Sequence, residues 1–336
     1  MLKILEKLCL LDGVSGEENK VSDFIISEID GFCEWKKDNL GNIIAFKKGK
    51  NKSAKKLMLD AHTDEVGLII TSITKDGFLK FKTVGGISCE ALLSRRVRIN
   101  GSIIGVIASK PIHLLKGEAA KKLPNADDLY IDIGLSDKSE VENLLSLGDR
   151  AVILSDFTIS DNKILSKALD DRIGCAILIT LLKENSDYDF YATFTVQEEV
   201  GLRGAKVAAF AINPDAAIII EATTAADISG VNYENQVCNL GEGAAVSFMD
   251  KATVYDKEYY NAALKSGVLV QPKRAVAGGN NSGVVHLNRE GVRTLSISVP
   301  CRYIHSASCV ADKRDINSAL ELTRYMINKI CSGDIK

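Results

Sequence analysis

Residues 189–205 of this chain read D-F-Y-A-T-F-T-V-Q-E-E-V-G-L-R-G-A. The first half is rich in aromatic and β-branched residues, which is typical of a strand. Because the run is apolar at consecutive positions, it predicts a central strand of a sheet that is covered on both faces. The strand ends at two adjacent carboxylates, Glu198 and Glu199. Neighbouring side chains that leave a strand point in opposite directions, so we expect these two carboxylates to have different roles.

The composition is that of an ordinary globular protein. Of the 336 residues, 46% are hydrophobic and 26% are charged, which excludes a disordered chain. The net charge is −2 and the basic residues are spread along the chain, which argues against binding to nucleic acid. Eight cysteines are scattered without a C-x-x-C pair, so we expect a reducing compartment and no thiolate zinc site.

The N-terminal residues 1–13 carry charges among their leucines, which predicts an amphipathic helix rather than a signal peptide. No apolar stretch approaches the roughly 20 residues of a membrane-spanning helix. We therefore expect a cytoplasmic protein with no membrane partner. A second helix is predicted next, opened by a capping box in which Ser15 precedes Glu18 by three positions.

The pattern of predicted secondary structure changes between Gly67 and Ser166. Short β-like runs dominate there and are bounded by Asp-Gly, Gly-Gly and Asn-Gly turn signals. Before and after this section, helical and strand patterns alternate, which is typical of an α/β fold. We therefore predict an α/β catalytic domain (residues 1–66 and 167–336) with a doubly wound mixed sheet flanked by helices. A small β-barrel or sandwich (residues 67–166) is inserted into it.

Other apolar strands also end in side chains that bind metals or protons. His62, Glu221 and His305 each follow such a strand, and the strand before His305, Thr294–Val299, is expected to be the last one. Asp170 opens a helix, where an acidic residue is expected from capping alone. If the strands are parallel neighbours, their carboxyl ends meet at one edge of the sheet, where ligands bind in open α/β folds. The shared position makes a common site the better interpretation.

Two imidazoles and three carboxylates without cysteine suit zinc, cobalt or manganese. Five protein ligands are too many for one catalytic zinc site, but they suit two metal ions that share a carboxylate. We expect His62 and Glu221 on one metal, Glu199 and His305 on the other, and Asp170 as the bridge. Two such ions activate a shared water for hydrolysis.

The remaining acidic residues of these motifs have predicted supporting roles. Glu198, next to a ligand but facing away from it, is the candidate general base that takes the proton of the water. Asp64, two residues after His62, is the candidate partner for the far nitrogen of that imidazole.

These motifs resemble the dinuclear metallo-aminopeptidases that include the glutamyl aminopeptidases and the tetrahedral, self-compartmentalising aminopeptidases. The resemblance runs over nearly the whole chain and rests on G-V-S-G-E-E, D-A-H-T-D-E-V-G, K-P-I-H-L-L, D-L-Y-I-D-I-G, A-L-D-D-R-I-G, V-Q-E-E-V-G-L-R-G-A, H-L-N-R-E-G-V and R-Y-I-H-S. It implies a catalytic domain interrupted by a β-rich dimerisation domain, the ligand roles given above, and Glu198 as general base. It also implies a homo-oligomer, a dodecamer or otherwise a dimer.

The chain departs from that family's pattern at three places. Glu221 stands where the family usually has Asp, and Gly278-Gly279-Asn280-Asn281 replaces the usual Gly-Gly-Thr-Asp. The segment Ile87–Glu90 lacks the usual aromatic residue and proline. The first two departures bear on metal binding and specificity, and the third on assembly.

The leading hypothesis is an aminopeptidase that trims short peptides. A related dinuclear deacylase on a small amide, and a scaffold that has lost its chemistry, are the alternatives. A glycosidase is disfavoured, because it uses a pair of carboxylates and leaves the two histidines and Asp170 without a role. An acidic specificity would need a cation in the pocket, for which Lys273 and Arg302 are candidates.

Overall fold

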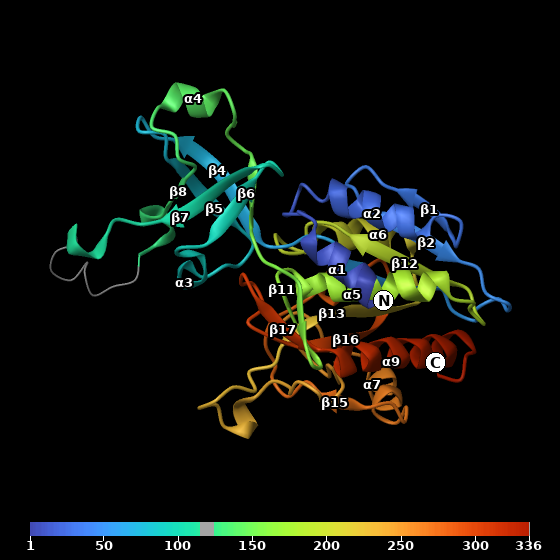
Figure 1. Ribbon diagram of the computed structural model, residues 1–336. Helices are drawn as coiled ribbons and strands as arrows, with labels where there is room; N and C mark the ends of the chain where they lie inside the picture. The colour runs from blue at the N-terminus through green and yellow to red at the C-terminus, as the bar shows by residue number, and fades with distance from the viewer. Residues whose placement is uncertain (115–123, 336) are drawn as a thin grey trace.

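The computed structural model describes residues 1–114 and 124–335, which form an α/β domain and a separate barrel (Figure 1). This confirms the predicted fold class. Across the large sheet the strands run β1 (Glu34–Lys37), β2 (Ile43–Lys47), β12 (Phe190–Thr195), β3 (Leu57–His62), β13 (Ala216–Thr224), β16 (Arg293–Arg302), β17 (Cys309–Asp312), β11 (Lys163–Ser166) and β10 (Thr158–Ser160). Two further strands, β14 (Ala244–Val246) and β15 (Val270–Pro272), extend from β16.

The centre of this sheet is parallel. β12, β3, β13 and β16 pair in parallel, with Thr195 beside His62 and Glu221 beside Ser298. These strands are buried almost throughout, which explains why they are apolar at consecutive positions. The flanking strands are antiparallel, so the sheet is mixed.

Helices cover both faces of the sheet. The larger core lies under α1 (Leu2–Leu10), α2 (Asn19–Ile29), α5 (Leu169–Lys183), α7 (Lys257–Leu264) and α9 (Lys313–Cys331). The opposite face packs against α6 (Arg203–Ile212) and α8 (Ser282–Val285), where alanines of α6 let the helix approach the strands closely. Among the described helices, none is long and apolar enough to cross a membrane.

Two local predictions were wrong. Ser15 and Glu18 do not form a capping box, because α2 begins at Asn19 and no side chain caps it. Ser15 Oγ instead donates to Asp64 (2.6 Å), and Glu18 accepts from the backbone amides of Gly16 and Gln197. The strand before His305 is not the last one, because β17 follows it and pairs with both β16 and β11.

The inserted section folds into a closed barrel. Its strands run β4 (Gly67–Ile73), β5 (Leu79–Val84), β8 (Tyr130–Asp132), β7 (Ile103–Ala108), β6 (Arg96–Ile99) and β9 (Arg150–Ile153). Short helices α3 (Cys89–Leu92) and α4 (Lys138–Glu142) and the 3-10 turns η1 (Ile112–Leu114) and η3 (Ala126–Asp128) connect them, whereas η4 (Tyr233–Asn235) lies in the α/β domain. The barrel has its own apolar core, distinct from those beside the sheet. The strands β10 and β11, which follow it, pair at the edge of the large sheet.

The barrel also touches the carboxyl edge of the sheet. Ala307, in the loop between β16 and β17, packs into the barrel core. Gly85, directly after β5, has φ +81°, and a Cβ added there would lie 3.3 Å from Cβ of Glu199. Glycine is required here because both the backbone conformation and the close approach exclude a side chain. The barrel therefore forms one wall beside the predicted site.

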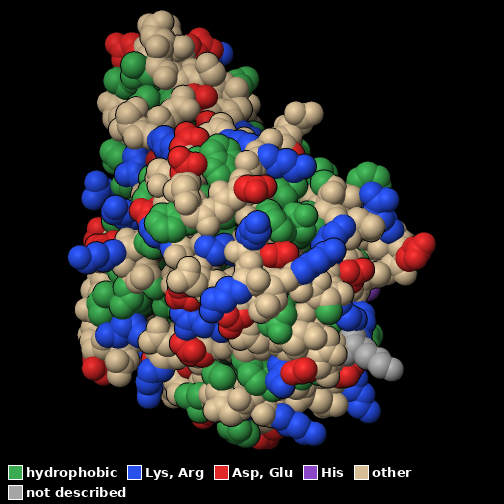
Figure 2. Space-filling view, turned by 90° about the vertical axis from the view of Figure 1, so that its right-hand side faces the viewer, with side chains coloured by type: hydrophobic (Ala, Val, Ile, Leu, Met, Phe, Trp, Pro, Cys, Tyr) green, Lys and Arg blue, Asp and Glu red, His purple; other side chains and the backbone are tan. Residues whose placement is uncertain are grey.

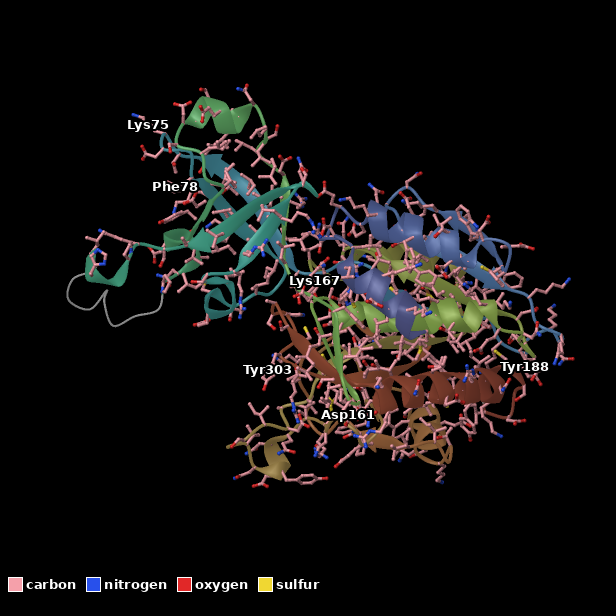
Figure 3. The ribbon with its side chains drawn as sticks, viewed as in Figure 1. Lys75, Phe78, Asp161, Lys167, Tyr188 and Tyr303 are labelled. Carbon is pink, nitrogen blue, oxygen red and sulfur yellow. The ribbon has the colours of Figure 1, made fainter. Side chains whose placement is uncertain are left out.

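A buried ion cluster ties the N-terminal helices to the start of α5. Lys167 Nζ donates to both carboxylate oxygens of Glu65 (2.6 Å each), and Arg172 donates to the same carboxylate at 3.3 Å. Both cations also donate to backbone carbonyls of the segment around α1. Lys167 lies at the junction between the barrel and the α/β domain (Figure 3).

We expect Glu65→Gln to destabilise the fold by about 3–5 kcal/mol, because it leaves two buried cations without an anionic partner. The matched control is Asp187→Asn, which removes an exposed ion pair with Lys50 and should cost below about 1 kcal/mol. Urea unfolding at equal protein concentrations measures both. Equal effects of the two variants would contradict a structural role for this cluster.

The surface carries charges of both signs. On the face shown in Figure 2, Lys and Arg side chains are interspersed with Asp and Glu rather than gathered in a patch of one sign. With a net charge of −2, this face offers no basic footprint for nucleic acid.

Candidate active site

The five predicted ligands come from the carboxyl edge of the parallel strands. His62 ends β3, Glu199 follows β12, Glu221 lies within β13 and His305 lies in the loop after β16. Asp170 lies in the first turn of α5, where its φ and ψ are not helical. All five line one cavity of about 340 Å³, together with Glu198. The structure thus brings the predicted residues together.

The Asp170 carboxylate lies between the two imidazoles. Its Oδ1 is 3.3 Å from Nε2 of His62, and its Oδ2 is 3.5 Å from Nε2 of His305. One carboxylate therefore presents one oxygen to each histidine, as a bridging ligand does. His62, Asp170 and Glu199 offer ligand atoms that all lie within 4.8 Å of one another.

The two other carboxylates differ in how they are held. Glu199 Oε1 is 3.2 Å from Nε2 of His305, the imidazole with which it is predicted to share a metal. Glu221 Oε1 instead accepts from Nδ2 of Asn280 at 2.8 Å, and the Ser296 and Ser298 hydroxyls also donate to it at 3.3 Å. Within the described residues, no hydrogen bond or ion pair joins Glu221 to His62.

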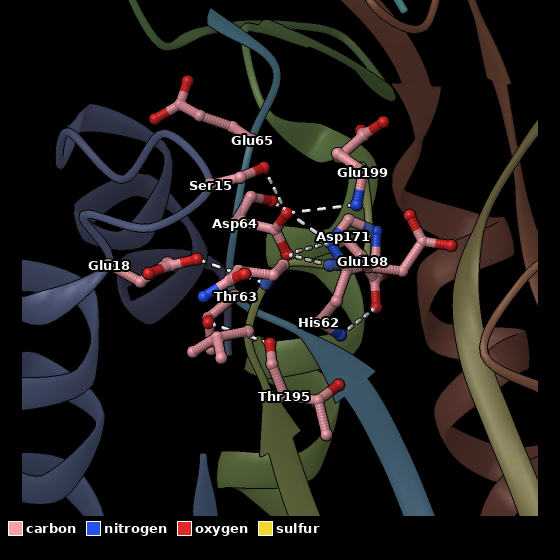
Figure 4. Close-up of polar contacts among 12 residues, drawn as sticks. Ser15, Glu18, His62, Thr63, Asp64, Glu65, Asp171, Thr195, Glu198 and Glu199 are labelled. Atoms are coloured by element: carbon pink, nitrogen blue, oxygen red, sulfur yellow. Dashed lines mark hydrogen bonds and ion pairs between the residues drawn. The ribbon is translucent and has the colours of Figure 1, made fainter. Parts of the chain in front are cut away.

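Asp64 is a fully buried hub beside these ligands (Figure 4). Its carboxylate accepts from Ser15 Oγ and from the backbone amides of Glu198 (2.9 Å) and Glu199 (3.1 Å). It also lies 3.4 Å from Nδ1 of His62, and the Asp64 backbone oxygen is closer to that nitrogen, at 3.1 Å. Asp64 thus orients both the imidazole and the two glutamates, so that Nε2 of His62 faces the cavity and the Asp170 carboxylate.

The backbone next to the ligands is held in unfavourable conformations. Ala168, Gln197, Tyr303 and His305 all have φ between 53° and 59°, a region that residues other than glycine rarely occupy. Such conformations gather at functional sites, where surrounding contacts hold them in place.

The cavity brings several acidic side chains together in a buried place. Burial raises the pKa of Glu198 to about 8, although His62 opposes the shift. Burial also raises the pKa of Glu221 to about 7 and the pKa of Glu199 above its usual value. Crowded, buried carboxylates resist ionisation when no cation is near. Divalent ions in this cavity would supply the positive charge that these carboxylates need in order to ionise.

His62 and His305 already supply part of this positive charge. Burial works to raise the pKa of Asp170, but hydrogen bonds with His305 and His62 outweigh it and hold the pKa well below the usual range. Burial works to lower the pKa of His305, but Asp170 and Glu199 raise it to about 11. This donor set, imidazole nitrogens and carboxylate oxygens in one cavity, fits zinc, cobalt or manganese.

Some contacts of the site could not be read from the sequence. Ser15 donates to the supporting residue Asp64, 49 residues away in the chain, and Asn280 donates to the predicted ligand Glu221, 59 residues away. The G-V-S-G-E-E motif was the only sequence signal for Ser15. Asn281, which follows Asn280 in the chain, donates its side-chain amide to the buried carboxylate of Asp60 at 2.7 Å. An acidic residue at position 281 would instead bring two carboxylates together.

Comparisons with known proteins identify the family of this chain. The family model described as M42 glutamyl aminopeptidase matches residues 41–322. The lysyl aminopeptidase of Pyrococcus furiosus is 31% identical to this chain. The match covers 98% of this chain and 97% of the length of that relative.

Solved structures show the same fold. The aminopeptidase APDkam598 of Desulfurococcus kamchatkensis is 35% identical with a TM-score of 0.91, covering 97% of this chain and 93% of its own. The TET1 peptidase of Pyrococcus horikoshii, which assembles into a tetrahedron or a large octahedral shell, is 31% identical with a TM-score of 0.84, covering 97% of this chain and 98% of its own. The resemblance inferred from the motifs is confirmed: the chain belongs to the M42 glutamyl aminopeptidase family and is an aminopeptidase.

Proposed function

We propose that this aminopeptidase works with two divalent metal ions, zinc or cobalt first and manganese as the alternative, held by His62, Asp170, Glu199, Glu221 and His305. The observation that supports this most strongly is the Asp170 carboxylate, which offers one oxygen to each of two imidazoles. The substrates are short peptides with a free N-terminus. We place the enzyme in the cytoplasm.

When bound, the two ions would supply Lewis acidity for the scissile carbonyl and would lower the pKa of the attacking water. Glu198 lines the same cavity, and within the described residues its side chain makes no hydrogen bond or ion pair. It is therefore free to take the proton of the water and to deliver it to the leaving amine. The Asp64 carboxylate accepts a hydrogen bond from the Glu198 backbone amide at 2.9 Å and so fixes the position of the backbone that carries this base.

We further propose that the barrel within the predicted insertion (residues 67–166) mediates association between subunits, outside the catalytic domain predicted as residues 1–66 and 167–336. The last strands of that insertion, β10 and β11, pair with the large sheet and so belong to the catalytic domain. The separate barrel core supports this division. The assembly of the related TET1 peptidase supports a homo-oligomer, with a dodecamer as the leading state and a dimer as the alternative. Sedimentation velocity of the purified chain distinguishes the two.

The test uses leucyl p-nitroanilide and its N-acetylated form, before and after chelation. We expect release from the free-amine substrate alone, loss of release after chelation, and recovery when zinc, cobalt or manganese is returned. Release from the acetylated form instead would favour the deacylase. Activity that survives complete removal of metal would overturn the metal-dependent mechanism.

A further inference from the structure

We infer that Asp250, Tyr255 and Asn280 form a positioning network for Glu221, which makes this carboxylate bind its metal ion through a single oxygen, Oε2. The inference rests on the proposed function, because it assigns positioning residues to one of the five proposed ligands. Among the described residues that line the cavity, none belongs to this network, so its three members act through Glu221.

The two oxygens of the Glu221 carboxylate have different surroundings. Oε1 accepts hydrogen bonds from Nδ2 of Asn280 at 2.8 Å and from the hydroxyls of Ser296 and Ser298 at 3.3 Å each. Across residues 1–114 and 124–335, no hydrogen bond or ion pair reaches Oε2. Because Glu221 lines the cavity and its Oε1 is already occupied, Oε2 is the oxygen left for a metal ion.

A backbone donor sets the direction of the Asn280 amide. Its Oδ1 accepts from the backbone amide of Ser282 at 2.7 Å, and a backbone N–H can only donate. Nδ2 therefore faces the other way, where its two shortest contacts are Glu221 Oε1 at 2.8 Å and the Tyr255 hydroxyl at 2.9 Å. Ser296 Oγ lies farther away, at 3.2 Å. An amide nitrogen carries two protons, and these two contacts use both of them.

The Tyr255 hydroxyl can accept one of those protons because its own proton is used elsewhere. It donates to Oδ2 of Asp250 at 2.6 Å. The other oxygen of Asp250 accepts from the backbone amides of Ala252 at 2.8 Å and Thr253 at 2.7 Å. Asp250 is thus held by its own turn, it fixes the direction of the Tyr255 hydroxyl, and that hydroxyl fixes the Asn280 amide.

The network is suited to holding a carboxylate that must keep its charge. Its three side chains and that of Glu221 are all buried, so water competes little for these hydrogen bonds. The donors to Oε1 are an amide and two hydroxyls, which are neutral. They restrain Glu221 without neutralising it, and its negative charge therefore stays available to an ion at Oε2.

The test measures zinc bound per chain at a series of buffered free-zinc concentrations, by elemental analysis. It compares the wild type with Asn280→Leu, which nearly keeps the size of the side chain but cannot donate. We expect the wild type to bind two ions. In Asn280→Leu one ion should bind about 10- to 100-fold more weakly, as for loss of other groups that support a metal ligand. The affinity for the other ion should change by less than about threefold.

A second variant tests whether the network acts as a unit. Tyr255→Phe removes only the hydroxyl and should weaken the same ion by about threefold to tenfold, as for loss of one neutral hydrogen bond. Because Tyr255 acts through Asn280, the double variant should bind that ion no more weakly than Asn280→Leu alone. Side chains that act independently would instead give additive effects.

Asn288→Leu and Tyr260→Phe are the matched controls. Asn288 donates to the Ala209 carbonyl at 3.1 Å, and the ring of Tyr260 packs edge-on against that of Phe248. Neither residue is among the described residues that line the cavity. Both variants should bind two zinc ions with wild-type affinities.

The outcomes separate this inference from the proposed function. Two ions in the wild type, with unchanged affinities or equal weakening of both ions in Asn280→Leu, would overturn the inference alone, and so would additive effects in the double variant. If circular dichroism shows that Asn280→Leu is unfolded, Tyr255→Phe decides, and an unchanged zinc affinity in that folded variant would overturn the inference. A wild type that binds two ions of none of zinc, cobalt or manganese would refute the proposed function itself.

Discussion

Replacing Glu198 with Gln is expected to lower kcat by about 10²- to 10⁴-fold while two metal ions stay bound. The change keeps the shape of the side chain and removes the group that takes a proton. Because the Glu198 side chain makes no hydrogen bond or ion pair among the described residues, the fold should be unaffected. Turnover of a p-nitroanilide and elemental analysis of the same sample measure both quantities.

The neighbouring carboxylate provides the control for this result. Glu199 contacts His305 at 3.2 Å, so Glu199→Gln should lose metal as well as activity. Two adjacent glutamates would then fail for different reasons, as expected for side chains that leave a strand in opposite directions. A Glu198→Gln enzyme with wild-type kcat would end the general-base assignment.

The second large effect is expected at Asp170. Asp170→Asn keeps the size of the side chain but removes the charge between His62 and His305. We expect metal affinity to fall by more than about 100-fold, because loss of groups that merely support a ligand already costs 10- to 100-fold. Activity at limiting metal should fall at least as much.

Isothermal titration of the metal-free protein with zinc or cobalt measures this affinity. The control is Asp127→Asn, the same chemical change at an exposed carboxylate of the barrel, which should leave affinity unchanged. Circular dichroism confirms that both variants are folded. Unaltered metal binding by Asp170→Asn would contradict its role as the shared ligand.

The main residues of the site could be predicted from the sequence because they follow the buried apolar strands that also define the fold. A strand buried on both faces must be apolar at consecutive positions, so the polar residue that ends it stands out. His62 and Glu199 are predicted in this way, and so is Glu221, although β13 continues past it to Thr224. Parallel pairing brings these positions together. The barrel was visible for a similar reason, because its short runs lie between strong turn signals.

The rest depends on contacts between distant residues. Ser15 has the spacing of a helix cap, but a buried carboxylate 49 residues away takes its hydroxyl instead. Asn280 lies in a glycine-rich loop without periodicity, so nothing local indicates that it holds Glu221.

We propose that two metal ions per chain carry the aminopeptidase activity. The most direct measurement adds zinc or cobalt stepwise to the metal-free protein and follows hydrolysis of the preferred p-nitroanilide together with the bound metal. We expect activity to rise until two equivalents per chain are bound and then to stay constant. Full activity at one equivalent, with no second ion bound, would contradict it.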